Sequence, residues 1–152
     1  MGKTKKVKKG HTQSKINKTA ENNKFSRISQ PPNGDQEKLS WQIRILDFDA
    51  PWGWGELDAK ALKYIHQKLA QFETMTWAEV THPNTGCHPI KVEDICIEAQ
   101  KRLIELKIIE EELFSLRFSG KERLWGIREQ HIFKILWWDP KHQVYPVSKK
   151  HT

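Results

Sequence analysis

The C-terminal part of the chain alternates apolar and polar residues over three consecutive stretches, and this period of two constrains the fold more than any other feature. The stretches run from Leu113 to Phe118, from Glu122 to Arg128 and from His131 to Trp138. Only two or three residues separate neighbouring stretches, which is the usual length of a β-hairpin connection. The pattern predicts three strands that form an antiparallel meander.

One strand and two helices are predicted before the meander. The strand runs from Trp41 to Phe48, with Trp41, Ile43 and Ile45 on one side. Apolar residues then recur at steps of three and four, which is typical of helices over residues 57–72 and 92–106. Between them, Thr76 and Glu79 have the spacing of a capping box, and residues 82–86 indicate a loop. The fold class is therefore α+β, with the order strand, two helices and three-stranded meander.

The charge of the chain is divided unevenly along it. Residues 1–40 contain ten Lys and Arg against three acidic residues, residues 41–116 contain eight against thirteen, and residues 117–152 contain eight against three. Residues 1–38 are also too polar to bury the surface that would offset the entropy of ordering. We expect a disordered basic N-terminal tail over 1–38 and a single α+β domain over 39–152, with any polyanion meeting the two basic ends.

Several classes of protein are excluded by what the sequence lacks. There is no apolar run long enough to span a bilayer, and the two cysteines, Cys87 and Cys96, fit a reducing compartment, so we expect a cytoplasmic protein. His82, Cys87 and His88 have no fourth ligand at zinc-type spacing. Since the chain also has no glycine-rich phosphate loop, no metal and no cofactor are predicted.

The predicted pairing of the meander gives its two faces different characters. One face would cover the helices, and the other would interleave cations with indoles. Arginine grips phosphate bidentately and an indole can stack on an unpaired base, so this second face suits single-stranded RNA. Alternatively, it is a solvated outer sheet face on which arginine stems shield Trp and Leu. Because its apolar residues would form a large exposed patch, we expect a partner or the C-terminal segment to cover them. The inner face contains Phe114, Leu116, Phe118, Leu124, Phe133, Ile135 and Trp137, and the outer face Arg117, Arg123, Trp125, Ile127, Ile132, Lys134, Leu136 and Trp138.

The stretch from Leu113 to Arg128 resembles the RelE/YoeB-like toxins of bacterial toxin–antitoxin systems. It has an Arg-containing strand, a short turn and a second strand that opens with Arg, and an apolar third strand follows. The strand-helix-helix-meander order over residues 41 to 145 is similar as well. The resemblance implies an endoribonuclease that needs no metal and cleaves messenger RNA. It also implies RNA, the ribosome and a neutralising antitoxin protein as partners.

The resemblance implies roles for three residues. Arg123 matches the phosphate-binding Arg of the family, Arg117 matches a basic residue of the preceding strand, and His142 falls near the general acid. The segment Asp139 to Tyr145 departs from the family's ending, and the acidic general base has no counterpart. A non-catalytic module that binds nucleic acid or protein through the same face is therefore the alternative. The further predicted RNA contacts are Lys121, Trp125, Arg128, Lys134, Trp138, Lys149 and Lys150.

Overall fold

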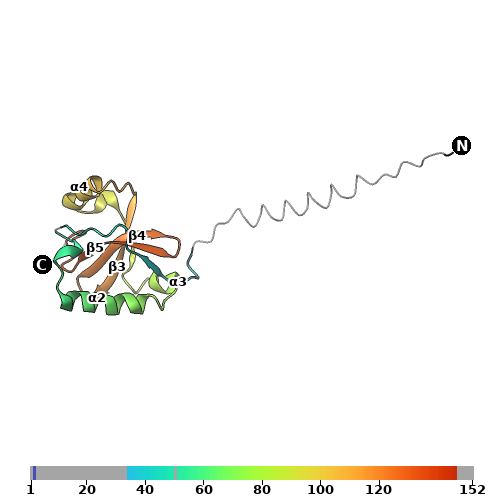
Figure 1. The fold of residues 1–152 in the computed structure, drawn as a ribbon, viewed down its shortest axis with the longest axis horizontal. Helices are drawn as coiled ribbons and strands as arrows, with labels where there is room; N and C mark the ends of the chain where they lie inside the picture. Colours follow the sequence, from blue (N-terminus) through green and yellow to red (C-terminus); the bar gives the residue numbers. More distant parts are fainter. Residues whose placement is uncertain (1, 3–33, 50, 147–152) are drawn as a thin grey trace. The chain divides into compact units, whose positions relative to one another are not determined.

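The computed structural model describes residues 2, 34–49 and 51–146 of the chain. The chain divides into two units, residues 1–32 and 33–152, and all the elements below belong to the second (Figure 1). The predicted tail therefore lies largely outside the described residues. In chain order the elements are β1 (Ser40–Gln42), η1 (Trp54–Glu56), α2 (Ala59–Phe72), α3 (Trp77–Val80), β2 (His88–Lys91), η2 (Val92–Asp94), α4 (Ile97–Glu105), β3 (Glu112–Ser119), β4 (Glu122–Glu129) and β5 (Ile132–Asp139).

The α+β class is confirmed, but the sheet is larger than predicted. Five strands form one mixed sheet in the order β1-β5-β4-β3-β2. Strands β3, β4 and β5 pair antiparallel as the predicted meander, while β1 runs parallel to β5 and β2 runs antiparallel to β3. Strand β2 escaped prediction because its four residues include Pro89, and proline is tolerated mainly in edge strands such as this one.

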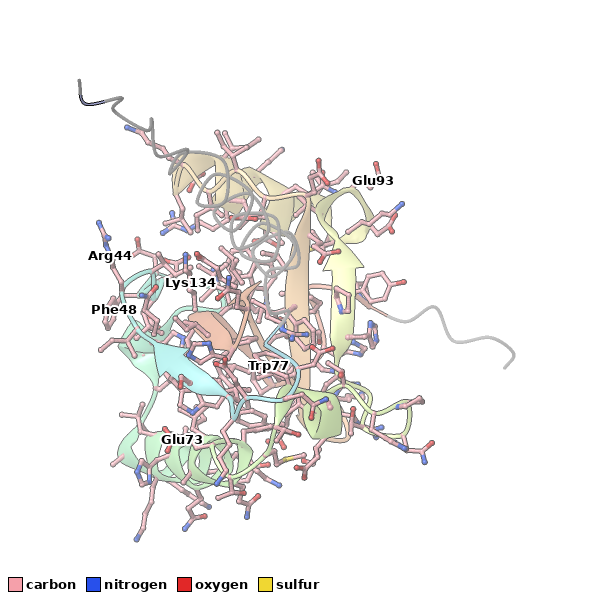
Figure 2. All side chains as sticks on the ribbon, turned by 90° about the vertical axis from the view of Figure 1, so that its right-hand side faces the viewer. Arg44, Phe48, Glu73, Trp77, Glu93 and Lys134 are labelled. Atoms are coloured by element: carbon pink, nitrogen blue, oxygen red, sulfur yellow. The ribbon has the colours of Figure 1, made fainter. Side chains whose placement is uncertain are left out.

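Both faces of the sheet are covered. Helices α2 and α3 cover one face, here called the α2 face, and helix α4 with the segment 140–145 covers the other, the α4 face (Figure 1). Six of the seven predicted inner residues do lie on the α2 face, where Trp77 is fully buried among them (Figure 2). The predicted outer face is covered in its apolar part, because Trp125 and Leu136 pack beneath α4 and Val144. Of the two covers expected for its apolar residues, a partner or the C-terminal segment, the C-terminal segment is present, together with α4.

A β-bulge reverses the predicted orientation of two tryptophans. Trp125 pairs with Trp137 but Gly126 pairs with Ile135, which leaves Leu136 as an extra residue of β5. An extra residue shifts every later side chain to the opposite face. Trp137 therefore packs on the α4 face and Trp138 on the α2 face, whereas the uninterrupted alternation predicts the reverse.

A buried carboxylate fixes α4 to the sheet. Asp47 accepts hydrogen bonds from Nε and a terminal nitrogen of Arg102 at 2.8 and 2.7 Å, and from Nε1 of Trp137 at 2.9 Å. Burial raises the pKa of Asp47, but the hydrogen bonds from Arg102, from Trp137 and from the Asp49 N–H outweigh it and hold the pKa below its ordinary value. Asp47 thus joins the chain after β1, helix α4 and strand β5.

The predicted first strand and second helix are shorter in the structure. After Gln42 the chain turns, with the Leu46 N–H donating to the Ile43 oxygen, and Ile43 is 67% exposed rather than facing inward. Helix α4 starts only at Ile97, because residues 95 and 96 are extended and the Cys96 N–H donates to the Val144 oxygen at 2.8 Å. The capping box of Thr76 and Glu79 is present as predicted.

The domain begins earlier than residue 39. The Trp77 N–H donates to the Glu37 oxygen at 3.0 Å, and the Ala78 N–H donates to the Asp35 oxygen at 2.8 Å. Asp35 also forms an ion pair with Arg128, whose guanidinium lies 4.1 Å from the centre of the Trp77 ring. Residues 34–38 are therefore part of the folded unit rather than of the tail.

The bulge makes position 126 intolerant of any side chain. A Cβ on Gly126 would lie 2.2 Å from the Lys134 oxygen and 2.4 Å from the Phe133 ring. We expect Gly126→Ala to destabilise the protein by about 3 kcal/mol, since backbone and a buried ring must both move. Gly120→Ala is the matched control, because its φ of 41° is strained but the space around it is open, and it should cost only about 1 kcal/mol. Thermal melting of both variants tests this, and equal losses would contradict the bulge.

Candidate functional site

Two arginines face each other across neighbouring strands at one end of the sheet. Arg117 of β3 and Arg123 of β4 are direct cross-strand partners. Both alternate with residues of the α2 face, namely Leu116, Phe118 and Leu124, so they continue the α4 face beyond its apolar cluster. Like charges directly opposite each other destabilise a sheet. Neither guanidinium forms an ion pair with any residue that the structure describes.

Local backbone features hold each arginine in place. Gly86 has a φ of 74°, and a Cβ there would come within 2.9 Å of Cδ of Arg117, so this glycine makes room for the arginine stem. The Arg117 N–H donates to Sγ of Cys87 at 3.3 Å. Arg123 donates from one terminal nitrogen to the Gly120 and Glu122 oxygens at 2.7 and 3.0 Å. These bonds orient the Arg123 guanidinium and leave its other donors available.

The environment of Arg123 is electrostatically unfavourable for a cation. Burial and, next, the positive charge of Arg117 lower the pKa of Arg123, and Cys87 and Asp139 oppose this shift only in part. A guanidinium nevertheless stays protonated at neutral pH. The pair therefore holds two positive charges close together, an arrangement that a bound anion would stabilise.

A third residue, His142, is held near the arginines by a loop after β5. The loop is fixed by Asp139, which is fully buried and pairs with Arg123 in the strand register. The Asp139 carboxylate accepts three hydrogen bonds: from Nε1 of Trp125 at 3.1 Å and from the N–H groups of Gln143 and Val144 at 2.8 and 3.0 Å. With these bonds made, His142 adopts a φ of 56° and lies partly buried at the sheet end.

The charges around His142 disfavour its protonation. Burial lowers the pKa of His142 most, and the cations Arg123 and Arg117 and the neighbouring His88 lower it further, while Asp139 opposes them. The imidazole is therefore neutral at neutral pH in the free protein, and a neutral ring can accept a proton. This electrostatic coupling also indicates that the three residues predicted as catalytic share one site.

His88 is a fourth member of the site that the sequence did not predict as functional. It pairs with Ser115 across β2 and β3, and Ser115 and Arg117 are two residues apart on the same strand face. The side chain is exposed, and its Nδ1 lies 3.1 Å from the Pro89 oxygen. The residue was missed because strand β2 was missed, and without β2 nothing aligned it with Arg117.

The two tryptophans predicted to stack on bases do not face solvent. Trp125 is fully buried and donates to Asp139, and Trp138 is 5% exposed and packs on the α2 face against Phe118. Their role as stacking surfaces has to be corrected: Trp125 supports the loop that carries His142. An indole has a polar N–H as well as a large apolar surface. In Trp125 the N–H donates to Asp139 and the apolar surface is buried.

The other predicted contacts are scattered. Lys121 lies exposed in the turn between β3 and β4, next to the arginines. Arg128 interacts with Asp35 and Trp77 elsewhere in the fold, and Lys134 forms an ion pair with Glu129 beside β1, on the side of the sheet away from β2 (Figure 2). Lys149 and Lys150 lie outside the described residues.

A hollow of about 220 Å³ lies beside Arg117 on its α2 side. Phe72, Met75 and Phe118 give it apolar walls, and Lys68 and Gln71 of α2 add polar groups. Its apolar walls belong to the α2 face, whereas Arg117 and Arg123 continue the α4 face, and Arg117 is the one of the two that borders the hollow.

The described residues include neither a candidate metal-binding cluster nor a candidate membrane-spanning helix. These residues hold no group of three or more His, Cys, Asp and Glu side chains that could bind a metal ion. None of the helices described is both long and apolar enough to cross a membrane. The predicted independence from metal and cofactor stays a prediction.

Comparisons with protein-family models, with curated proteins and with solved structures gave no match to this chain. The geometry of the site therefore carries the functional assignment.

The coupling between His142 and the arginines can be measured directly. Replacing Arg117 with Gln removes one positive charge near the ring, so the pKa of His142 should rise toward its ordinary value. NMR titration of the imidazole C–H signals measures this pKa. Arg44→Gln, which changes an exposed arginine beyond β1 (Figure 2), is the matched control and should leave it unchanged. An unchanged pKa in Arg117→Gln would separate His142 from the arginines.

Proposed function

We propose that the protein binds single-stranded RNA at a backbone phosphate and cleaves it there without a metal ion. The observation that carries the proposal is the cross-strand pair of Arg117 and Arg123, two cations without a carboxylate partner in the described structure. A phosphodiester between them would neutralise their repulsion, and each planar guanidinium can hold phosphate oxygens bidentately. The basic C-terminal quarter of the chain supports an anionic ligand.

The reaction is transfer of the phosphoryl group to the neighbouring ribose hydroxyl. A base takes the proton of the 2′-OH, the 2′-oxygen attacks phosphorus, and the bond to the 5′-oxygen breaks as that oxygen receives a proton. The products are a 2′,3′-cyclic phosphate and a 5′-hydroxyl, so no co-reactant is needed. Arg117 and Arg123 stabilise the negative charge that develops on the phosphorane.

His142 suits the first proton transfer better than the second. The resemblance implies that it is the general acid, but the lowered pKa keeps its ring neutral in the free protein. A general base must be unprotonated at the working pH. We therefore assign to His142 the removal of the 2′-OH proton.

The relation to RelE/YoeB-like toxins remains part of the proposal. It is supported by the order of β1, α2, α4 and the meander β3 to β5, and by the position of Arg117, Arg123 and His142. The short helix α3 and strand β2 are additions between α2 and α4. A ribosome-bound messenger RNA as substrate, an antitoxin as partner and a cytoplasmic location follow from the resemblance alone.

Arg123 provides the direct test of this function. Arg123→Ala should reduce RNA cleavage about 100-fold or more, the loss expected when a preorganised charge donor is removed. Arg123→Lys should restore little, because an ammonium lacks the planar fork of the guanidinium. Cleavage is measured in the presence of a chelator, on free RNA and on translating ribosomes, together with the melting temperature of each variant.

Lys63→Ala, on the exposed side of α2, is the matched control and should cleave at the wild-type rate. Binding of RNA by the wild type without cleavage would favour the alternative of a non-catalytic binding module. Wild-type cleavage by a folded Arg123→Ala protein would remove this residue from the mechanism.

A further inference from the structure

The proposed reaction needs a second proton-transfer group, and the structure offers few candidates for it. The 5′-oxygen must gain a proton as it leaves, while His142 already carries the proton of the 2′-OH. Asp139 cannot serve, because it is buried and its two oxygens accept three hydrogen bonds. Glu122 binds the hydroxyl groups of Tyr64 and Ser119, and Tyr64 belongs to the α2 face.

His88 satisfies the geometric requirement that these residues fail. His88 and Ile90 are two residues apart in strand β2, so they lie on the same face of the sheet. Because Ile90 packs on the α4 face, His88 lies on the same sheet face as the arginines. Its partner Ser115 precedes Arg117 by two residues on β3, which makes His88 the diagonal neighbour of Arg117. Diagonal neighbours lie about 7–8 Å apart, within reach of a ligand held by the arginine.

The two histidines approach the arginine pair from different elements. His142 comes from the loop after β5, on the β5 side of Arg123, while His88 comes from β2, on the other side of β3. A phosphate between Arg117 and Arg123 would therefore have an imidazole on each side. Attack on phosphorus from one side and departure on the other require this arrangement.

The hydrogen bond at Nδ1 of His88 determines which ring nitrogen can react. When Nδ1 is protonated it donates to the Pro89 oxygen at 3.1 Å, which leaves Nε2 as the nitrogen that exchanges a proton with a ligand. Arg117 from β3 is the charged diagonal neighbour of His88, and His88 lies close enough to His142 to affect it electrostatically.

We propose that His88 is a second catalytic residue, which delivers a proton from Nε2 to the departing 5′-oxygen. The assignment rests on the proposed function, since it completes the same reaction. In the balanced step, His142 gains the 2′-OH proton, the bond from the 2′-oxygen to phosphorus forms, the bond to the 5′-oxygen breaks, and His88 loses one proton. Water later returns the two rings to their starting protonation states.

A substrate with a different leaving group separates this role from a structural one. If the scissile 5′-oxygen of an RNA is replaced by sulfur, the leaving thiolate is a much weaker base and departs without a proton. His88→Asn, whose amide can still donate to the Pro89 oxygen, should slow cleavage of ordinary RNA about 100-fold. It should slow cleavage of the sulfur-containing RNA less than about threefold.

His142→Asn should slow both substrates about 100-fold, because the base is needed whatever the leaving group. His66→Asn, on the exposed side of α2, is the matched control and should slow neither. Equal slowing of both substrates by His88→Asn, or no slowing of ordinary RNA, would overturn the role of His88 while Arg123→Ala still reports on the proposed function. Failure of the wild type to cleave either substrate would overturn both.

Discussion

The site depends on two buried aspartates, each bound by the indole of a cross-strand tryptophan pair. Trp125 and Trp137 are direct partners on β4 and β5, and they donate from Nε1 to Asp139 and to Asp47 respectively. A buried carboxylate without such donors would cost several kcal/mol, so its partners are held in fixed positions. The tryptophan pair therefore positions two loops over the sheet at once.

Two segments cover the α4 face, and each is held in place by one of the two aspartates. Asp47 binds Arg102 and so attaches α4, which seals one end of the face. Asp139 binds the N–H groups of residues 143 and 144 and so bends the chain back over the sheet, with Val144 buried against the indoles. Arg117 and Arg123 lie at the end of the sheet where this loop leaves β5, and Arg117 remains exposed there. In the covered part of the face, apolar side chains are buried and stabilise the fold. The uncovered part remains accessible to a ligand.

The sequence predicted the parts of this structure that depend on local periodicity. The meander, most of its inner face and the capping box of Thr76 follow from regular spacing, and so does the position of Arg117 and Arg123 on one face. Alternation of apolar and polar residues does not indicate the bulge at Leu136, so the sequence assigns Trp137 and Trp138 to the wrong faces. The tryptophans also look like ligand surfaces until their N–H groups are known to bind aspartates. His88 required β2, a strand too short to be recognised and interrupted by proline.

The pairing of charges along the strands supports the proposal that the arginines form a binding site. Elsewhere in the described structure the strand cations are paired, as Arg128 is with Asp35 and Lys134 with Glu129. A protein that used Arg117 and Arg123 only for solubility would gain from a carboxylate between them, because opposite charges across strands are stabilising and like charges are not. Asp139 is close enough in register to have served, but its oxygens are turned to backbone N–H groups and to Trp125. The fold thus commits its nearby carboxylate to the loop of His142, and the described residues provide no ion-pair partner for the two arginines.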